Sequence, residues 1–258
     1  MTEDTTCAVS FTGAYKSFGS KEVLHGLNFH IERGEVVSLI GPSGAGKSTT
    51  LRCLTLLERL DRGRIAYGDT VVCDNEGSKG AVYDRTAEQA ARMHFGLVFQ
   101  GYNLFPHRTV LQNVCDAPVV VQKRDEEEVQ KQGKELLERL DLKEQENMVP
   151  CELSDGQQQR VAIARALCMN PDVMYFDEAT SALDPKLTWD MRDLIRQLAQ
   201  QGMAVGIVTH EMDFAETVSD RICLLIGGEI IEEGSPQSIV KSATDPRTQA
   251  FLSFANKA

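Results

Sequence analysis

The stretch Gly41-Pro42-Ser43-Gly44-Ala45-Gly46-Lys47-Ser48 decides how this 258-residue chain is interpreted. Its spacing matches the phosphate-binding loop G-x-x-x-x-G-K-[ST]. The apolar run Val36–Ile40 before it predicts a strand, and Lys47–Leu57 after it predicts a helix. Glycines let backbone N–H groups crowd around a phosphate, and the helix start adds the positive end of its dipole. We therefore expect Lys47 to contact the phosphates of a nucleoside triphosphate and Ser48 to ligate Mg²⁺.

Two further strand ends carry polar residues suited to the same chemistry. The apolar run Val173–Phe176 is followed by Asp177 and Glu178. One carboxylate at such a strand end can hold Mg²⁺, and its neighbour can polarise an attacking water. A later strand, Ala204–Thr209, is followed by His210. Ligands of open α/β sheets collect at the carboxyl edge of the strands, so His210 should lie at the same edge as Glu178.

Composition limits the classes of protein that the chain can represent. A hydrophobic content of 42% and a charged content of 25% are typical of a globular protein with a sizeable core. The net charge of -11 argues against nucleic acid or an anionic lipid surface as a direct partner. The N-terminus lacks the pattern of a signal peptide, and the apolar runs are far shorter than the roughly 18 residues of a membrane span. Seven scattered cysteines indicate reduced, mostly buried thiols.

The order of the expected elements indicates an α/β fold. Residues 9–40 are expected to form strands and residues 61–80 a hairpin region with glycine-containing turns, and an alternation of strands and helices follows Pro171. Between them, Asp125–Leu140 has apolar residues on one helical face, and Ser154–Met169 is a second expected helix. We therefore expect a single domain over residues 1–258, in which 1–100 and 171–258 form the core and 101–170 a mainly helical subdomain.

Together these segments resemble the ATP-binding subunit of an ABC transporter, over essentially the whole chain. Residues 153–167, beginning Leu-Ser-Asp-Gly-Gln, are similar to the signature segment of that family and its helix. Residues 177–184, Asp-Glu-Ala-Thr-Ser-Ala-Leu-Asp, resemble its Walker B and D-loop pair. Gln100 matches the Q-loop, His210 the H-loop, and Phe18 the aromatic residue that stacks on adenine. The resemblance implies a P-loop NTPase core with a β-rich N-terminal part and an inserted α-helical signature subdomain.

The resemblance also implies which residues act. Catalysis is expected from Glu178, His210 and Lys47, and metal binding from Ser48, Gln100 and Asp177. The residues expected to bind the nucleotide are Phe18, Gly41, Pro42, Ser43, Gly44, Ala45, Gly46, Lys47, Ser48, Thr49, Gln100, Ser154, Gly156 and Gln157. The expected cofactors are ATP and Mg²⁺. Two subunits stack head to tail, so that each ATP lies between one chain's phosphate loop and the other chain's signature segment.

Residues 98–107 and the triple glutamine at 157–159 are similar to those of bacterial polar amino acid importers. That implies a chain at the cytoplasmic face of the membrane, bound to permease subunits and served indirectly by an extracytoplasmic solute-binding protein. The expected ATPase partner is a second copy of the chain. The transported solute itself is set by those other subunits.

Two positions depart from the pattern of the family. Asp155 stands where the signature usually has glycine, and Ala179 where the importer pattern usually has proline. Asp155 places a carboxylate near a site that receives phosphate, which keeps open a catalytically weak ABC ATPase with a regulatory, non-transport role. A soluble ABC ATPase acting on DNA or ribosomes would need a long coiled-coil insertion or two cassettes. A GTPase or kinase would leave the signature unexplained.

Overall fold

The computed structural model describes residues 7–75, 80–178 and 185–255, apart from the side chains of 185–187, 254 and 255. Its first sheet is antiparallel, with the strand order β2-β1-β4-β5-β6. These strands are β1 (Cys7–Phe18), β2 (Lys21–Glu32), β4 (Arg62–Tyr67), β5 (Thr70–Asn75) and β6 (Ala81–Tyr83). The β-rich N-terminal part predicted from the sequence is therefore confirmed.

The second sheet has the order β11-β10-β3-β9-β8-β7. Its strands are β3 (Val36–Ile40), β7 (Phe95–Val98), β8 (Val173–Asp177), β9 (Ala204–Val208), β10 (Arg221–Ile226) and β11 (Glu229–Gly234). Only β10 and β11 pair antiparallel, and the other neighbours in this sheet are parallel. The carboxyl ends of β3, β7, β8 and β9 consequently face one edge of the sheet.

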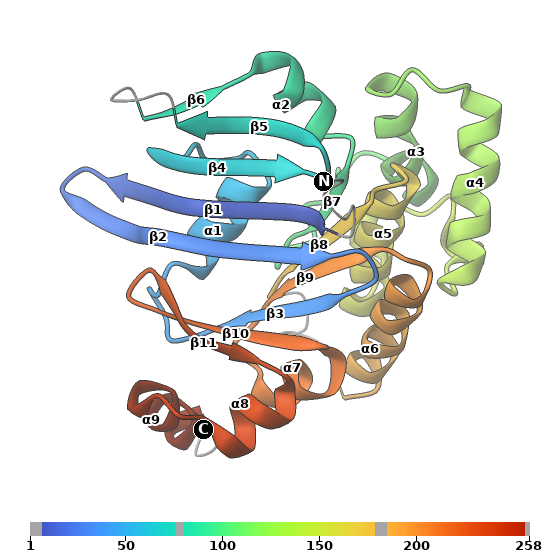
Figure 1. Ribbon diagram of the computed structural model, residues 1–258. Coiled ribbons are helices and arrows are strands. Elements are labelled where there is room, and N and C mark those ends of the chain that lie inside the picture. The colour runs from blue at the N-terminus through green and yellow to red at the C-terminus, as the bar shows by residue number, and fades with distance from the viewer. Residues whose placement is uncertain (1–6, 76–79, 179–184, 256–258) are drawn as a thin grey trace.

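Helices pack against both sheets, most of them against the second (Figure 1). They are α1 (Lys47–Leu54), α2 (Arg85–Ala91), α3 (Val110–Val120), α4 (Glu126–Arg139), α5 (Asp155–Cys168), α6 (Pro185–Gln200), α7 (Met212–Val218), α8 (Pro236–Ser242) and α9 (Pro246–Ala255). Two short 3-10 turns, Lys143–Gln145 and Pro150–Glu152, connect α4 to α5. The predicted helices at 125–140 and 154–169 are confirmed as α4 and α5. The division into a core and a 101–170 subdomain stays a prediction.

Apolar side chains form separate layers on the two faces of the second sheet. One cluster joins both sheets through α1 and includes Phe11, Leu51 and Tyr175. The hydroxyl of Tyr67 donates to the carbonyl of Leu54 at 2.8 Å and lies 3.0 Å from the hydroxyl of Tyr175. On the other face, α3 to α6 pack against β7, β8 and β9. Five of the seven cysteines are buried in these layers or next to them, as the sequence predicted.

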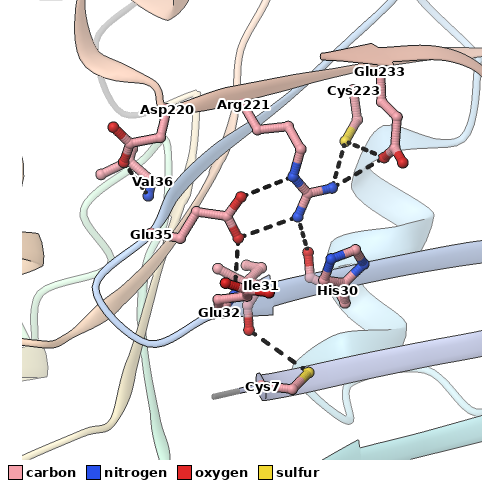
Figure 2. A network of polar contacts seen from close by, with 10 residues as sticks. All are labelled: Cys7, His30, Ile31, Glu32, Glu35, Val36, Asp220, Arg221, Cys223 and Glu233. Carbon is pink, nitrogen blue, oxygen red and sulfur yellow. Dashed lines mark hydrogen bonds and ion pairs between the residues drawn. The ribbon is translucent and has the colours of Figure 1, made fainter. Parts of the chain in front are cut away.

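A polar network fastens the two sheets together where β2 runs beside β10 and β11 (Figure 2). Arg221 donates to Glu35 at 2.8 Å, to Glu233 at 3.0 Å and to the carbonyl of His30 at 2.8 Å. The side chains of Arg221 and Glu35 are only 16% and 17% exposed. Arg221 thereby ties the turn before β3 to β2 and to β11.

One predicted helix is shorter than the sequence indicated. We expected Lys47–Leu57, but α1 ends at Leu54. Leu56 has a φ of 56° and its N–H bonds to the carbonyl of Cys53, while Leu57 donates to Arg52. These are the two hydrogen bonds of a Schellman C-cap, a motif that glycine usually provides. Leu56 is buried in the same apolar cluster as Leu51, whereas Leu57 is 56% exposed.

Candidate functional site

The predicted phosphate loop joins the end of β3 to the start of α1 and borders a cavity of about 460 Å³. The cavity is lined by Lys21, Val23, Gly41, Ser43, Gly44, Gly46, Lys47, Ser48, Thr49, Glu178 and His210. Residues that are more than 160 positions apart in sequence therefore meet at one place. Pro42 and Ala45 belong to the loop without lining the cavity.

Two glycines of the loop are required by their surroundings. A Cβ on Gly41 would lie 2.1 Å from the carbonyl oxygen of Leu225, and its φ of 148° is unusual for any other residue. Gly46 has a φ of 112°, and a Cβ added to it would lie 3.0 Å from the Leu24 side chain. Gly46 is also the N-cap of α1 and makes no side-chain cap bond. The first N–H groups of α1 thus remain available for an anion.

Lys47 is held in place by the loop itself. Its ammonium group donates to the carbonyl of Gly41 at 2.8 Å and to that of Pro42 at 3.1 Å, and the residue is 7% exposed. Burial lowers the pKa of Lys47, and the carboxylates of Glu178 and Asp177 partly oppose that effect. A buried cation stabilised by carbonyl dipoles is positioned to receive a negatively charged ligand.

The strand-end residues lie together at the carboxyl edge of the sheet. Glu178 follows β8, and His210 follows β9, which is paired with β8. The Nδ1 atom of His210 is 3.6 Å from Oε1 of Glu178. Glu178 has a φ of 48° and donates its N–H to the carbonyl of Val208. A left-handed conformation is uncommon for a glutamate, and such backbone strain clusters at functional sites.

Glu178 and Ser48 both line the phosphate cavity, whereas Asp177, the predicted Mg²⁺ ligand one residue before Glu178, is absent from its lining. Burial, and then the negative charge of Glu178, raise the pKa of Asp177 above its ordinary value. Two carboxylates and the Ser48 hydroxyl form a donor set that suits a hard divalent cation. In the part of the chain that the structure describes, no cluster of three or more His, Cys, Asp or Glu side chains could hold a metal. Mg²⁺ commonly takes its other ligands from water and from the phosphates of a substrate.

Gln100 and Phe18, two predicted nucleotide residues outside the phosphate loop, also lie outside the lining of this cavity. Gln100 is on the exposed turn that follows β7, at the same sheet edge as Asp177. Phe18 ends β1 and is 47% exposed, and the ammonium group of Lys16 lies 5.0 Å from its ring centroid. Phe18 is paired across the β1–β2 hairpin with Lys21, which does line the cavity. An exposed aromatic ring at this point can stack on a planar base.

The predicted signature residues form a separate group at the start of α5. Ser154 is the N-cap of this helix, and its N–H donates to the side chain of Gln157 at 2.9 Å. Gln157 returns a bond of 3.4 Å to the Ser154 hydroxyl, which completes a capping box. Ser154, Gly156 and Gln157 are all absent from the lining of the phosphate cavity. The predicted signature residues and the phosphate loop are therefore separate from one another within this chain.

The structure adds residues that the sequence did not single out. Lys21 and Val23 line the phosphate cavity only because the β1–β2 hairpin returns to it. Arg165 of α5 donates to the carbonyls of Asn103 and Tyr102 at 2.7 and 2.8 Å. Burial, and then the charge of Asp155, raise the pKa of Tyr102. The segment after Gln100 is thus tied to the helix of the signature.

Residues 179–184, which include Ala179 and the predicted D-loop, lie outside the described residues. The helix that follows them is α6. Among the residues that the structure does describe, no helix has the length and apolar character needed to cross a bilayer.

Relatives align with this chain over nearly its whole length. A family model described as ABC transporter matches residues 24–181. The L-cystine import ATP-binding protein TcyC of Bacillus subtilis is 45% identical over 240 residues, 93% of this chain and 95% of the relative. The glutamine transport ATP-binding protein GlnQ of Escherichia coli is 43% identical and covers 95% of this chain and 98% of its own.

Solved structures share the fold. That of cbiO1 from Clostridium perfringens, part of the ABC transporter complex cbiONQ, has a TM-score of 0.81 at 27% identity and covers 92% of each chain. The ATP-binding cassette MJ0796, solved as a post-hydrolysis dimer bound to ADP and Pi, has a TM-score of 0.76 at 34% identity, covering 88% of this chain and 98% of the cassette. With the matching phosphate loop and paired carboxylates, these findings place the chain in the ABC transporter family, whose ATP-binding domain it carries.

Proposed function

We propose that this chain is the ATP-hydrolysing subunit of an importer that moves a small polar solute, an amino acid, through a membrane permease. One observation carries the catalytic part: the phosphate loop, Glu178 and His210 border a single cavity. The amino acid is supported by relatives at 42–46% identity whose names specify transport of cystine, arginine or glutamine.

The chemistry follows from the charge and position of each side chain. Lys47 and the free N–H groups at the start of α1 stabilise the phosphates of ATP. Glu178 orients the attacking water and accepts its proton, and His210, 3.6 Å from Glu178, contacts the γ-phosphate. Ser48, Asp177 and Gln100 would hold Mg²⁺. When bound, this ion neutralises charge on the phosphates.

The position of the signature supports a head-to-tail pair of identical chains. Ser154, Gly156 and Gln157 do not reach the cavity of their own chain, so the γ-phosphate would meet the signature segment of a second copy. The Gln100 segment would link the nucleotide to the permease, and a solute-binding protein would act through that permease. The chain would then lie at the cytoplasmic face of the membrane.

An uptake assay tests this function. Cells that lack the gene are complemented with the wild-type chain or with Glu178→Gln, and the uptake of radiolabelled amino acids is measured. The wild type is expected to restore uptake of at least one amino acid, and the variant to restore none although it is present at equal abundance. Equal uptake with and without the gene would refute the transport role.

A regulatory role is the second candidate, and Asp155 is the observation that favours it. Asp155 is the first residue of α5, so its carboxylate lies beside the N–H groups that would face the phosphate bound by a partner chain. A strongly hindered closure would leave a chain that binds ATP with little turnover. Basal ATP hydrolysis by the purified wild-type chain separates the two candidates.

A further inference from the structure

A second cavity, remote from the phosphate loop, lies between the signature helix and the helix that follows residues 179–184. Its volume is about 240 Å³. It is lined by Arg139, Leu140, Asp141, Gly156, Gln159, Arg160, Ile163, Asp190, Met191, Asp193, Leu194 and Gln197. These residues come from α4, α5 and α6, and Figure 1 shows α5 between the other two helices. Drug-sized ligands occupy about 300–1,000 Å³, so this cavity suits a smaller metabolite.

Gln159 contributes to this cavity a buried side-chain amide that lacks hydrogen-bond partners among the described residues. It is 1% exposed, and neither its Oε1 nor its Nε2 has a hydrogen-bond partner among the described residues. A buried amide left in this condition costs about 1–3 kcal/mol, and buried polar groups in proteins are nearly always paired. Gly156, one turn before it, adds no side chain, and Ile163, Met191 and Leu194 supply apolar surface.

Charged residues of both signs line the same cavity as this amide. The structure gives no hydrogen bond or ion pair to Arg139 on α4 or to Asp190 on α6, within the residues that it describes. By contrast, Arg160 is already occupied by the carbonyl of Leu140 at 3.3 Å, and Asp193 by Arg192 at 2.9 Å. The lining thus contains a cation (Arg139) and an anion (Asp190) without a described partner, and an amide (Gln159) that can both donate and accept hydrogen bonds.

We propose that this cavity binds a small zwitterion of the α-amino acid class, with its carboxylate toward Arg139, its ammonium group toward Asp190 and a hydrogen bond to the amide of Gln159. A single ligand would then satisfy the orphaned amide and both free charges. Because the cavity is bordered by α5 and α6, such a ligand would bridge the signature helix and the helix after the Asp177–Glu178 segment. The proposal stands independently of the solute that the importer carries.

Binding to the purified full chain is measured by calorimetry, with each standard L-amino acid and L-cystine as probes at millimolar concentration. At least one is expected to bind. Its methyl ester, which lacks the carboxylate, and its N-acetyl derivative, which lacks the ammonium group, are each expected to bind about tenfold more weakly or worse, since a hydrogen bond to a charged group contributes about 1.5–3 kcal/mol. Absence of binding by every amino acid, or equal binding of the blocked derivatives, would overturn the proposal.

Variants locate the site and exclude a folding defect. Gln159→Leu keeps the size of the side chain and removes the unpaired amide, so the melting temperature should stay the same or rise while amino acid affinity falls about tenfold. Asp190→Asn should lose affinity to a similar degree. Gln200→Leu, further along α6 and outside the lining, is the matched control and should bind normally.

Lys47→Ala separates this site from the nucleotide cavity. It should bind the amino acid as the wild type does, even though it loses ATP. Loss of amino acid binding in Lys47→Ala together with normal binding in Gln159→Leu would place the ligand in the phosphate cavity and refute the site. Failure of the uptake assay would leave these binding results unchanged.

Discussion

At the scale of single residues, Lys47 is the residue of the phosphate loop whose substitution tests nucleotide binding. The ammonium group of Lys47 rests on the carbonyls of Gly41 and Pro42 and takes no part in the apolar clusters. Lys47→Ala should therefore abolish the rise in melting temperature that Mg-ATP produces, while leaving the unliganded protein folded. The exposed Lys131→Ala on α4 is the control and should shift like the wild type. An unchanged ATP shift in Lys47→Ala would mean that the loop does not bind the nucleotide.

Glu178 should act on turnover and not on binding. Because its carboxylate is expected to accept a proton from the attacking water, Glu178→Gln should slow hydrolysis by roughly 10²–10⁴-fold. The affinity for ATP should be retained. Glu211→Gln changes a nearby carboxylate that does not line the cavity, so it serves as the control. Steady-state ATP hydrolysis measures the effect, and turnover like that of the wild type would remove Glu178 from the mechanism.

Asp177 should destabilise the unliganded protein. Its pKa is raised by burial and by Glu178, so the folded state binds a proton more tightly than the unfolded state does. The contribution of Asp177 to the free energy of unfolding therefore falls as pH rises from the ordinary carboxyl pKa through the raised pKa. Asp177→Asn should melt a few degrees higher than the wild type at neutral pH, and this advantage should vanish as pH falls below that range. Melting curves across pH test it, and an advantage that persists in acid would contradict the account.

At the scale of elements, the first residue of α5 bears most directly on the pairing of two chains. Asp155 is a favourable first-turn residue, because a carboxylate there interacts with the helix dipole. In a closed pair the partner's γ-phosphate would approach the same helix end. Two unit charges about 7 Å apart repel by roughly 2 kcal/mol at an effective dielectric of about 20. Solvent and Mg²⁺ screen part of this repulsion.

Asp155→Gly should therefore tighten ATP-driven pairing by about five- to tenfold at low salt, raise hydrolysis and slightly lower the stability of the monomer. The dimer dissociation constant in a Glu178→Gln background, with and without the glycine, measures the change. Equal constants at low salt would show that Asp155 is a solvated cap with no effect on the nucleotide.

Sequence periodicity predicted the long elements and missed those defined by distant contacts. The apolar faces of α4 and α5 were sufficient to predict both helices. The end of α1 was misplaced because Leu56, and not a glycine, adopts the left-handed C-cap. The strand β7 was not predicted, because its role depends on pairing with β8, which lies more than 70 residues further along the chain. The same limit explains Lys21, which reaches the phosphate cavity only through the β1–β2 hairpin.

At the scale of the whole molecule, the fold places the phosphate-loop cavity and the predicted signature residues apart from each other. Motif spacing predicted both sets of residues, including the meeting of Glu178 and His210. It could not predict the second cavity, because Gln159 and Asp190 come from helices that the sequence does not pair. Nor does any motif show that Arg165 ties the Gln100 segment to α5.

We predict that two chains pair around ATP, and sedimentation velocity with Mg-ATP measures this pairing. The Glu178→Gln chain should become a dimer when ATP is added. Adding Ser154→Asp keeps an equally good N-cap but places a negative charge beside the incoming phosphate, whereas Ser154→Asn keeps the cap without charge. The account predicts that Glu178→Gln/Ser154→Asp stays monomeric with unchanged ATP affinity while the Asn variant still pairs. Equal dimerisation of the Asp and Asn variants would contradict it.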